Sequence, residues 1–182
     1  MGQLENRSDS QAGGRGKRKE ELRLVRKAKA GDTKSFSALY AQIYIELYKF
    51  ALYTLRHPQD AEDAVSEAVT AAYENITKLK SETSFRNWMF TILANQCRKR
   101  FIKREKDEEL TEDIAQPEID YGQKADVRAA LETLSEEERL IVSFSVFGGY
   151  KSAEIGGMLG IEAATVRSKK NRALGKMRKI LE

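Results

Sequence analysis

The sequence contains very little cysteine and histidine. Cys97 is its only cysteine and His57 its only histidine, which excludes an internal disulfide and leaves no Cys/His cluster for a structural zinc. No run of apolar residues approaches the ~18 needed to cross a membrane, and no apolar segment near the N-terminus resembles a signal peptide. These absences predict a cytoplasmic protein with no membrane insertion, no metal and no cofactor.

Proline is nearly absent too, and no segment shows the apolar/polar alternation of a strand. Pro58 and Pro117 are the only prolines, so long segments can be helical without interruption. The apolar residues instead recur at intervals of three and four, which is the period of a helix. The sequence therefore predicts an all-α fold.

Charge is distributed unevenly along the chain, although the net charge is only +4. Basic clusters occupy residues 15–19, 98–104 and 167–179, and the last of them contains no acidic residue. Residues 105–120 are strongly acidic and lie between the second and third clusters. Two basic regions separated by an acidic one indicate two sites that meet an anion, joined by a tether that avoids it.

The first half of the chain predicts a helical bundle. Residues 1–19 are polar and glycine-rich, and we expect them to be disordered. From residue 20 to 104 we expect four helices: Asp32 caps a long one that ends before Pro58, Asp60 caps the next, and Ser84 opens the last. Residues 105–126 have the composition of a flexible acidic linker.

The second half, residues 127–182, predicts a smaller helical domain. Ser135 and Glu138 have the spacing of a capping box, and the pair Gly148-Gly149 should end the helix that they begin. Gly156, Gly160 and Val166 then have the spacing of a helix-turn-helix: a small residue where two helices cross, a glycine in the turn, and an aliphatic anchor on the second helix. The alternative interpretation is a basic C-terminal helix with a merely solvated face.

The second helix of this motif would present side chains suited to reading DNA. Arginine can bind guanine or phosphate, asparagine can read adenine, and hydroxyls can do either. The outward-facing candidates are Thr165, Arg167, Ser168, Lys169, Asn171 and Arg172.

Both halves resemble one known family, in order and across the variable linker. The second half carries Leu134–Arg139, Gly148-Gly149, Ala153–Ile155, Leu159–Ile161 and Thr165–Ser168. The first half carries Ala30–Asp32, Leu47–Ala51, Asp60–Ala64, Phe85–Trp88 and Ala94-Asn95. Together these segments resemble bacterial RNA polymerase sigma factors of the extracytoplasmic-function type, within the sigma-70 superfamily.

The resemblance implies a function and three sets of site residues. Such a protein binds core RNA polymerase, at the beta-prime clamp and the beta flap, and directs promoter recognition, melting and initiation, with no catalytic residues of its own. The family's docking helix maps to Asp60, Glu62, Asp63 and Glu67. Its minus-ten DNA contacts map to Phe85, Asn87, Trp88, Asn95, Arg98 and Lys99, beside a base-capturing loop at residues 80–85. The minus-thirty-five contacts map to the six outward-facing candidates, and the family commonly has an anti-sigma factor as a further partner.

Several residues have alternative interpretations or depart from the family pattern. Trp88 lies four residues before Ile92, a spacing that favours a core position, and Cys97 fits a half-buried helix residue better than a redox switch. Glu162 and Lys170 depart from the family pattern, as do Ala164 and Ser152, which puts the minus-thirty-five sequence preference in doubt.

Two other functional classes, a stand-alone DNA-binding regulator and an enzyme, explain less of the sequence. A helix-turn-helix repressor or activator would explain the C-terminal half but leaves residues 60–95 without a role. An enzyme would need clustered metal-binding carboxylates, a glycine loop that holds phosphate, or an activated nucleophile. Asp60, Asp63 and Glu67 are the only candidates for metal-binding carboxylates, and no second acidic strand or histidine supports them.

Overall fold

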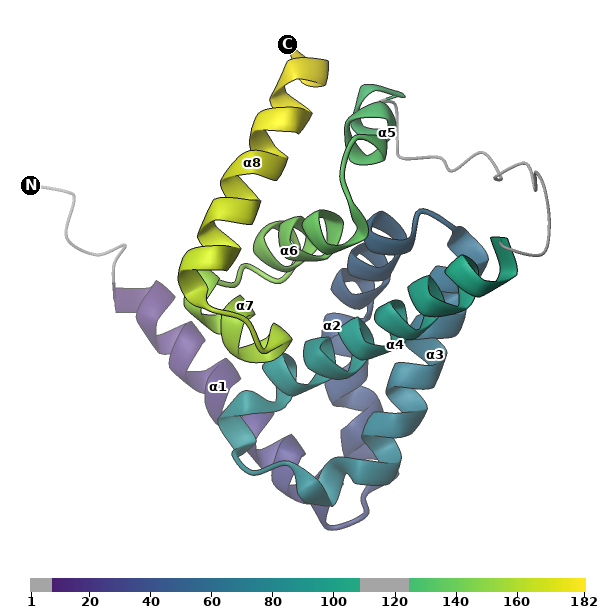
Figure 1. The fold of residues 1–182 in the computed structure, drawn as a ribbon. Coiled ribbons are helices and arrows are strands. Elements are labelled where there is room, and N and C mark those ends of the chain that lie inside the picture. The colour runs from purple at the N-terminus through teal and green to yellow at the C-terminus, as the bar shows by residue number, and fades with distance from the viewer. Residues whose placement is uncertain (1–7, 109–124) are drawn as a thin grey trace, which may run out of the picture.

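The computed structural model describes residues 8–108 and 125–182, and all regular secondary structure within these two ranges is helical (Figure 1). The helices are α1 (Ser8–Lys29), α2 (Thr33–Leu55), α3 (Pro58–Asn75), α4 (Phe85–Glu108), α5 (Ala125–Glu132), α6 (Glu136–Val146), α7 (Ser152–Leu159) and α8 (Ala163–Leu181). Two short 3-10 turns, η1 (Ile76–Lys78) and η2 (Glu82–Ser84), join α3 to α4. The predicted all-α class with two helical regions is confirmed.

Helix α1 begins earlier than the sequence predicts. We expected disorder up to residue 19, but the helix begins at Ser8, and residues 16–20 are exposed. Val25 and Ala28 are buried and hold the C-terminal turns of α1 against the rest of the first half. Once those turns are fixed, adding further turns costs little, because helix nucleation is the unfavourable step.

Helix α3 begins differently from the prediction as well. Asp32 is the N-cap of α2, as expected, but the N-cap of α3 is His57 and not Asp60. Pro58 occupies the first turn, where its missing N–H has no helical partner to lose. The imidazole Nδ1 of His57 accepts a hydrogen bond from the backbone N–H of Asp60 at 3.3 Å, so Asp60 lies inside the first turn.

The segment between α3 and α4 is more ordered than a polar loop. Ile76 and Leu79 are buried within it, and α4 begins at Phe85, one residue after the expected Ser84. At its other end α4 continues to Glu108, so residues 105–108 belong to a helix and not to the linker. The rest of the predicted linker, apart from Ala125 and Asp126 at the start of α5, lies outside the described residues.

The local predictions for the second half are confirmed. Ser135 and Glu138 form a complete capping box: Ser135 Oγ accepts from the Glu138 N–H at 3.3 Å, and the Glu138 carboxylate accepts from the Ser135 N–H at 2.9 Å. Helix α6 then ends at Val146, just before the two glycines.

The helix-turn-helix has the close crossing that its glycines predict. Gly160 ends α7 in the left-handed region, with φ of 69°, a conformation that residues with a Cβ rarely adopt. A Cβ on Gly156 would lie 2.6 Å from the carbonyl oxygen of Ile161 and 3.4 Å from the backbone nitrogen of Ala163. Val166 is fully buried and anchors α8.

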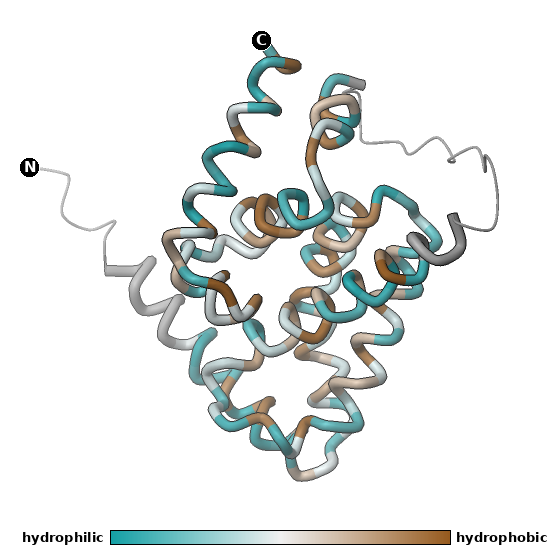
Figure 2. The backbone as a smooth tube through the Cα atoms, viewed as in Figure 1, coloured by the Kyte–Doolittle hydropathy of each residue, from teal (hydrophilic) through white to brown (hydrophobic). Residues whose placement is uncertain are grey.

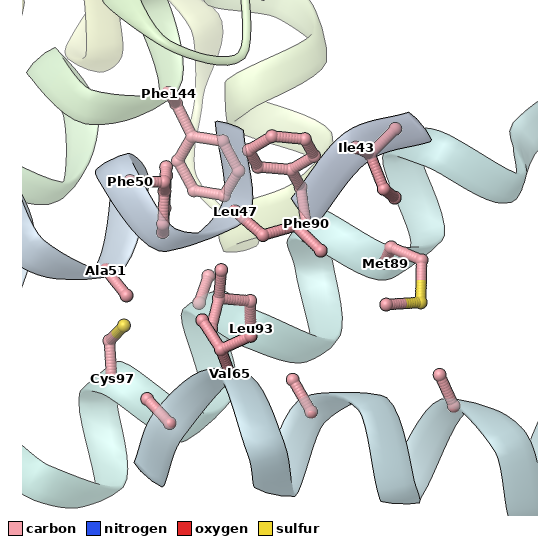
Figure 3. Packing of buried hydrophobic residues seen from close by; sticks show 14 of the residues in the cluster. Ile43, Leu47, Phe50, Ala51, Val65, Met89, Phe90, Leu93, Cys97 and Phe144 are labelled. Atoms are coloured by element: carbon pink, nitrogen blue, oxygen red, sulfur yellow. The ribbon is translucent and has the colours of Figure 1, made fainter. Parts of the chain in front are cut away.

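A single apolar cluster spans both halves of the chain. Phe144 of α6 points toward Phe50 of α2 and Phe90 of α4 (Figure 3), and all three rings are fully buried. Leu140, Ile141 and other buried residues of the second half belong to the same cluster as the core of α1–α4. Along α8, by contrast, hydrophilic stretches alternate with short apolar ones (Figure 2), as befits a helix at the edge of the molecule.

Candidate nucleic-acid and docking surfaces

Helix α3 carries a carboxylate face whose members differ in their surroundings. Glu62 and Asp63 are exposed, and Gln59 donates a 3.3 Å hydrogen bond to Asp63. Asp60 is half-buried, and its carboxylate lies 3.7 Å from His57 Nδ1. Glu67 is exposed but is paired with Arg100 of α4 at 3.0 Å. Glu62 and Asp63 are exposed and form no ion pair with any side chain that the structure describes, so they offer the more accessible negative charge.

A groove of about 370 Å³ lies beside this face, between α2 and α3. Tyr40, Tyr44 and Tyr48 line its α2 side at intervals of four residues, and their rings pack in sequence at 5.6 and 6.3 Å. Glu62 lies at the groove, and its charge adds to burial in raising the pKa of Tyr48. The sequence did not predict this groove, although the four-residue spacing of Tyr40, Tyr44 and Tyr48 is visible in it.

The expected minus-ten residues of α4 do not share one environment. Phe85 is 1% exposed, with its ring packed edge-on against Phe36, so its side chain belongs to the core and not to the surface. Trp88 is half-buried and packs against the core, in agreement with the core position that its spacing from Ile92 favours. Asn95 and Lys99 are exposed, and their spacing of seven and eleven residues from Trp88 places them near the same helix face.

Asn87 and Arg98 complete this set. Asn87 is half-buried, and its backbone carbonyl accepts a hydrogen bond from the Thr91 hydroxyl at 2.8 Å. The Arg98 guanidinium donates to the carbonyl of Leu159, the last residue of α7, at 3.4 Å. Arg98 therefore faces the second half of the molecule.

Cys97 lies on the opposite face of α4 from the exposed side chains. It is fully buried, not half-buried as predicted, and burial raises the pKa of its thiol to about 12. The thiolate is the reactive form of cysteine, so a thiol in this position is inert.

Helix α8 presents most of the expected minus-thirty-five residues to solvent. Thr165, Arg167, Ser168, Asn171 and Arg172 are all exposed. Lys169 is the exception, because its ammonium forms an ion pair with Glu137 of α6. The structure therefore brings five of the six predicted side chains onto an accessible surface that follows the tight turn at Gly160.

Two lysines of α8 face α6 and hold the two helices together. Lys176, seven residues after Lys169, donates to both carboxylate oxygens of Glu138, at 2.7 and 2.9 Å. Burial alone would raise the pKa of Glu138, but the hydrogen bonds from Lys176 and from the Ser135 N–H outweigh it and lower the pKa below its ordinary value. Glu138 thus both completes the capping box at the start of α6 and holds α8 against α6.

Sequence reasoning missed this pairing because it treated residues 167–179 as one basic surface. The only signal available was the pair of adjacent carboxylates in the first turn of α6, whose partners are more than thirty residues away.

No described helix is long and apolar enough to cross a membrane. Within residues 8–108 and 125–182, no cluster of His, Cys, Asp or Glu side chains is arranged to hold a metal ion.

Comparison with known proteins assigns a family to each half. Residues 39–108 match the model for Sigma-70 region 2, and residues 124–177 match the model for Sigma-70, region 4. The chain is 27% identical to the ECF RNA polymerase sigma factor SigM of Mycobacterium tuberculosis over 173 residues, covering 93% of this chain and 88% of SigM. It is 26% identical to RNA polymerase sigma factor SigV of Bacillus subtilis over 137 residues, covering 73% and 82% of the two chains.

Solved structures show the same fold. The sigma factor RpoE in complex with the anti-sigma factor NepR, from Bartonella quintana, superposes with a TM-score of 0.70 at 22% identity, covering 82% of this chain and 98% of RpoE. CnrH in complex with the cytosolic domain of CnrY gives a TM-score of 0.68 at 22% identity, covering 89% and 97%. Two sigma-70 regions in order on one all-helical chain, with relatives of the same organisation across most of its length, identify this protein as a member of the sigma-70 family, of the extracytoplasmic-function type.

Proposed function

We propose that the chain binds core RNA polymerase and directs it to promoters, where it takes part in recognition, melting and initiation. The observation that carries this proposal is that one chain has two surfaces of opposite charge, on α8 and on α3. An accessible DNA-reading helix, α8, follows a tight helix-turn-helix, while α3 presents a carboxylate face that would repel DNA and suits a basic protein partner.

The α3 face is proposed to dock on the polymerase clamp. Glu62 and Asp63 provide exposed negative charge, and Asp60 and Glu67 extend it along the helix. The tyrosine groove beside Glu62 adds amphipathic contact area, which is common in protein interfaces. A cation of the polymerase at Glu67 would have to compete with Arg100.

Helix α4 is proposed to meet the minus-ten element. A flipped base loses stacking worth a few kcal/mol, and an aromatic or amide surface offsets part of that loss. Trp88, Asn95 and Asn87 can provide such a surface, and Lys99 and Arg98 can bind phosphates. Because Phe85 is buried, we leave its side chain out of the proposed DNA contacts.

Helix α8 is proposed to read the minus-thirty-five element. Arg167, Asn171 and Arg172 have the donors and acceptors that distinguish base pairs in the major groove, and Thr165 and Ser168 can contact bases or phosphates. Lys169 could reach DNA only by leaving Glu137. On this proposal the protein acts in the cytoplasm as an initiation factor and has no catalytic site, and an anti-sigma factor would be a further partner.

Reconstitution with core polymerase on a promoter library tests the proposal. We expect promoter-specific transcripts that depend on this chain, and little specific DNA binding by the chain alone. Tight sequence-specific binding to duplex DNA without polymerase would instead show a repressor or activator.

A charge reversal tests the docking surface separately. Asp63→Arg should abolish binding to core polymerase and leave the fold intact, because Asp63 is exposed. Glu74→Arg makes the same charge change at another exposed position on α3 and should bind normally. Equal affinity of the two variants for core polymerase would refute the docking assignment.

A further inference from the structure

Helix α1 lies outside the parts of the chain that match the sigma-70 models. The region 2 match begins at residue 39, whereas α1 ends at Lys29. From residue 16 to residue 29 this helix carries seven basic side chains and two acidic ones. Basic side chains complement the helix dipole only in the last turn, so those of the earlier turns need another explanation.

Four of these cations form one exposed side of the helix, which we call the basic face of α1: Lys19, Arg23, Arg26 and Lys27. They lie at i, i+4, i+7 and i+8, a spacing that places side chains on one side of a helix. Val25 and Ala28 are buried on the opposite side and hold α1 against the bundle. At a rise of 1.5 Å per residue the basic face is about 12 Å long, enough to meet two or more phosphates of a DNA strand.

The members of the basic face are accessible to an external anion. Arg23 donates to Glu20 of the same helix at 2.7 Å, and Arg26 pairs with Glu82 of η2 at 2.7 Å. Lys27, like Lys19, is exposed and forms no ion pair with any side chain that the structure describes. Ion pairs between exposed side chains contribute little to stability, so neither pair prevents its guanidinium from turning to a phosphate.

The basic face leads to the segment that precedes the proposed minus-ten helix. Arg26 reaches Glu82 in η2, and Lys29 in the last turn of α1 donates to the backbone carbonyl of Leu79 at 2.8 Å. The C-terminal end of α1 thus lies beside the connection from α3 to α4 (Figure 1), and Trp88 is in the first turn of α4. A DNA strand bound at the start of α4 therefore passes close to one end of the basic face.

Nucleic acid fits this face better than a membrane or a protein does. A helix that lies on a membrane buries its apolar side in the lipid, but the apolar side of α1 is packed into the bundle. The cores of protein interfaces are rich in aromatic residues and poor in lysine, whereas the basic face contains lysine and arginine only. A sugar–phosphate backbone requires positive charge spaced along a line, which this face provides.

We propose that the basic face of α1 binds the phosphate backbone of promoter DNA beside the minus-ten element, without reading its sequence. The location rests on the proposed function, whereas the affinity of the face for a phosphate backbone concerns the chain by itself. Each phosphate that a cation neutralises releases counterions, so every cation of the face adds to the salt dependence of binding. The face adds the same affinity to every promoter sequence.

The salt dependence of promoter binding by the holoenzyme measures the contribution of each lysine. Lys19→Gln and Lys27→Gln should each lower the slope of log affinity against log salt by about 1, and the double variant should lower it by about 2. The loss of affinity should be equal for promoters of different sequence, and the affinity for core polymerase should not change. Lys49→Gln removes an exposed lysine from α2 and should leave the slope as it is.

Three results of this experiment would overturn the proposal. An unchanged slope for the double variant would show that the face is only solvated. A change of the same size with Lys49→Gln would show an effect of net charge alone. A loss of affinity for core polymerase in place of DNA would make the face a protein-binding surface.

An iron chelate attached at residue 27 tests the location. Lys27→Cys provides an exposed thiol, while Cys97 is buried with a pKa of about 12 and stays unlabelled. In the promoter complex the chelate should cut the DNA backbone beside the minus-ten element, and a chelate on Lys49→Cys should not cut there. Cuts elsewhere, or no cuts, would overturn the location.

Binding of the free chain to random-sequence duplex DNA at low salt separates this proposal from the proposed function. Non-specific binding consists almost entirely of phosphate contacts, so it reports on the basic face without a promoter. If the parent gives no promoter-specific transcripts with core polymerase, the proposed function fails and this measurement decides. A slope that falls by about 2 in the double variant supports a phosphate-binding face, and an unchanged slope or no binding by the parent overturns it.

Discussion

Gly156 and Gly157 are neighbours on α7, yet the structure predicts opposite effects when each is replaced by alanine. Both lie inside a helix, where alanine is favoured over glycine by roughly 0.5–1 kcal/mol. A Cβ on Gly157 would have no atom within 4 Å. Gly157→Ala should therefore stabilise the protein by about that amount.

Gly156→Ala adds a methyl group where the two helices cross. Its Cβ would lie 2.6 Å from the Ile161 carbonyl oxygen, which is backbone and cannot rotate away. Overpacking of this kind costs roughly 1–3 kcal/mol. Moving the turn would also weaken the hydrogen bond from the Ile161 N–H to the Gly156 carbonyl, now 3.0 Å long, which is worth about 1 kcal/mol. After the helix preference of alanine is subtracted, a net loss of roughly 1–3 kcal/mol remains.

Urea unfolding of the parent and both variants, followed by circular dichroism, measures the difference. Because the two halves share one apolar cluster, we expect one cooperative transition for each protein. The midpoint should fall for Gly156→Ala and rise for Gly157→Ala, with unchanged slopes. A Gly156→Ala variant as stable as the parent would show that α7 and α8 do not cross as closely as the structure has them.

Three further predictions concern single side chains. Glu138→Gln should lower the free energy of unfolding by roughly 1–2 kcal/mol at pH 7, because the lowered pKa of the Glu138 carboxyl stabilises the fold. That stabilisation is present above the ordinary pKa of about 4.5 and is lost as the pH falls through the folded pKa, so the difference in stability between variant and parent should narrow in acid. Unfolding measured across pH checks this, and a difference that does not narrow would contradict it. The Cys97 thiol should not react with a thiol reagent at pH 8 until urea unfolds the chain, and rapid labelling of the folded protein would refute its burial. Lys99→Ala should lower the slope of log affinity against log salt for holoenzyme on promoter DNA by about 1, whereas the exposed Lys49→Ala should leave the slope unchanged.

Features that depend on neighbouring residues were predictable from the sequence. The capping box of Ser135 and Glu138, the N-cap at Asp32 and the close crossing at Gly156 each involve contacts within a few residues, and the structure has all three. Local signals failed where two of them competed, as at the start of α3, where a proline in the first turn moved the N-cap from Asp60 to His57.

The sequence alone therefore determined the helical class, the order of the elements, the helix-turn-helix and the resemblance to a family. The tertiary structure decided which side chains of those elements are accessible. Phe85 is in the core while Asn95 is exposed, and Lys169 pairs with a carboxylate while Arg167 faces solvent. It also decided how the halves meet, through contacts such as the one between Arg139 and Thr54, which are 85 positions apart in the chain. Periodicity shows only which face of a helix is apolar, and the partner of that face is set by the packing of the whole chain.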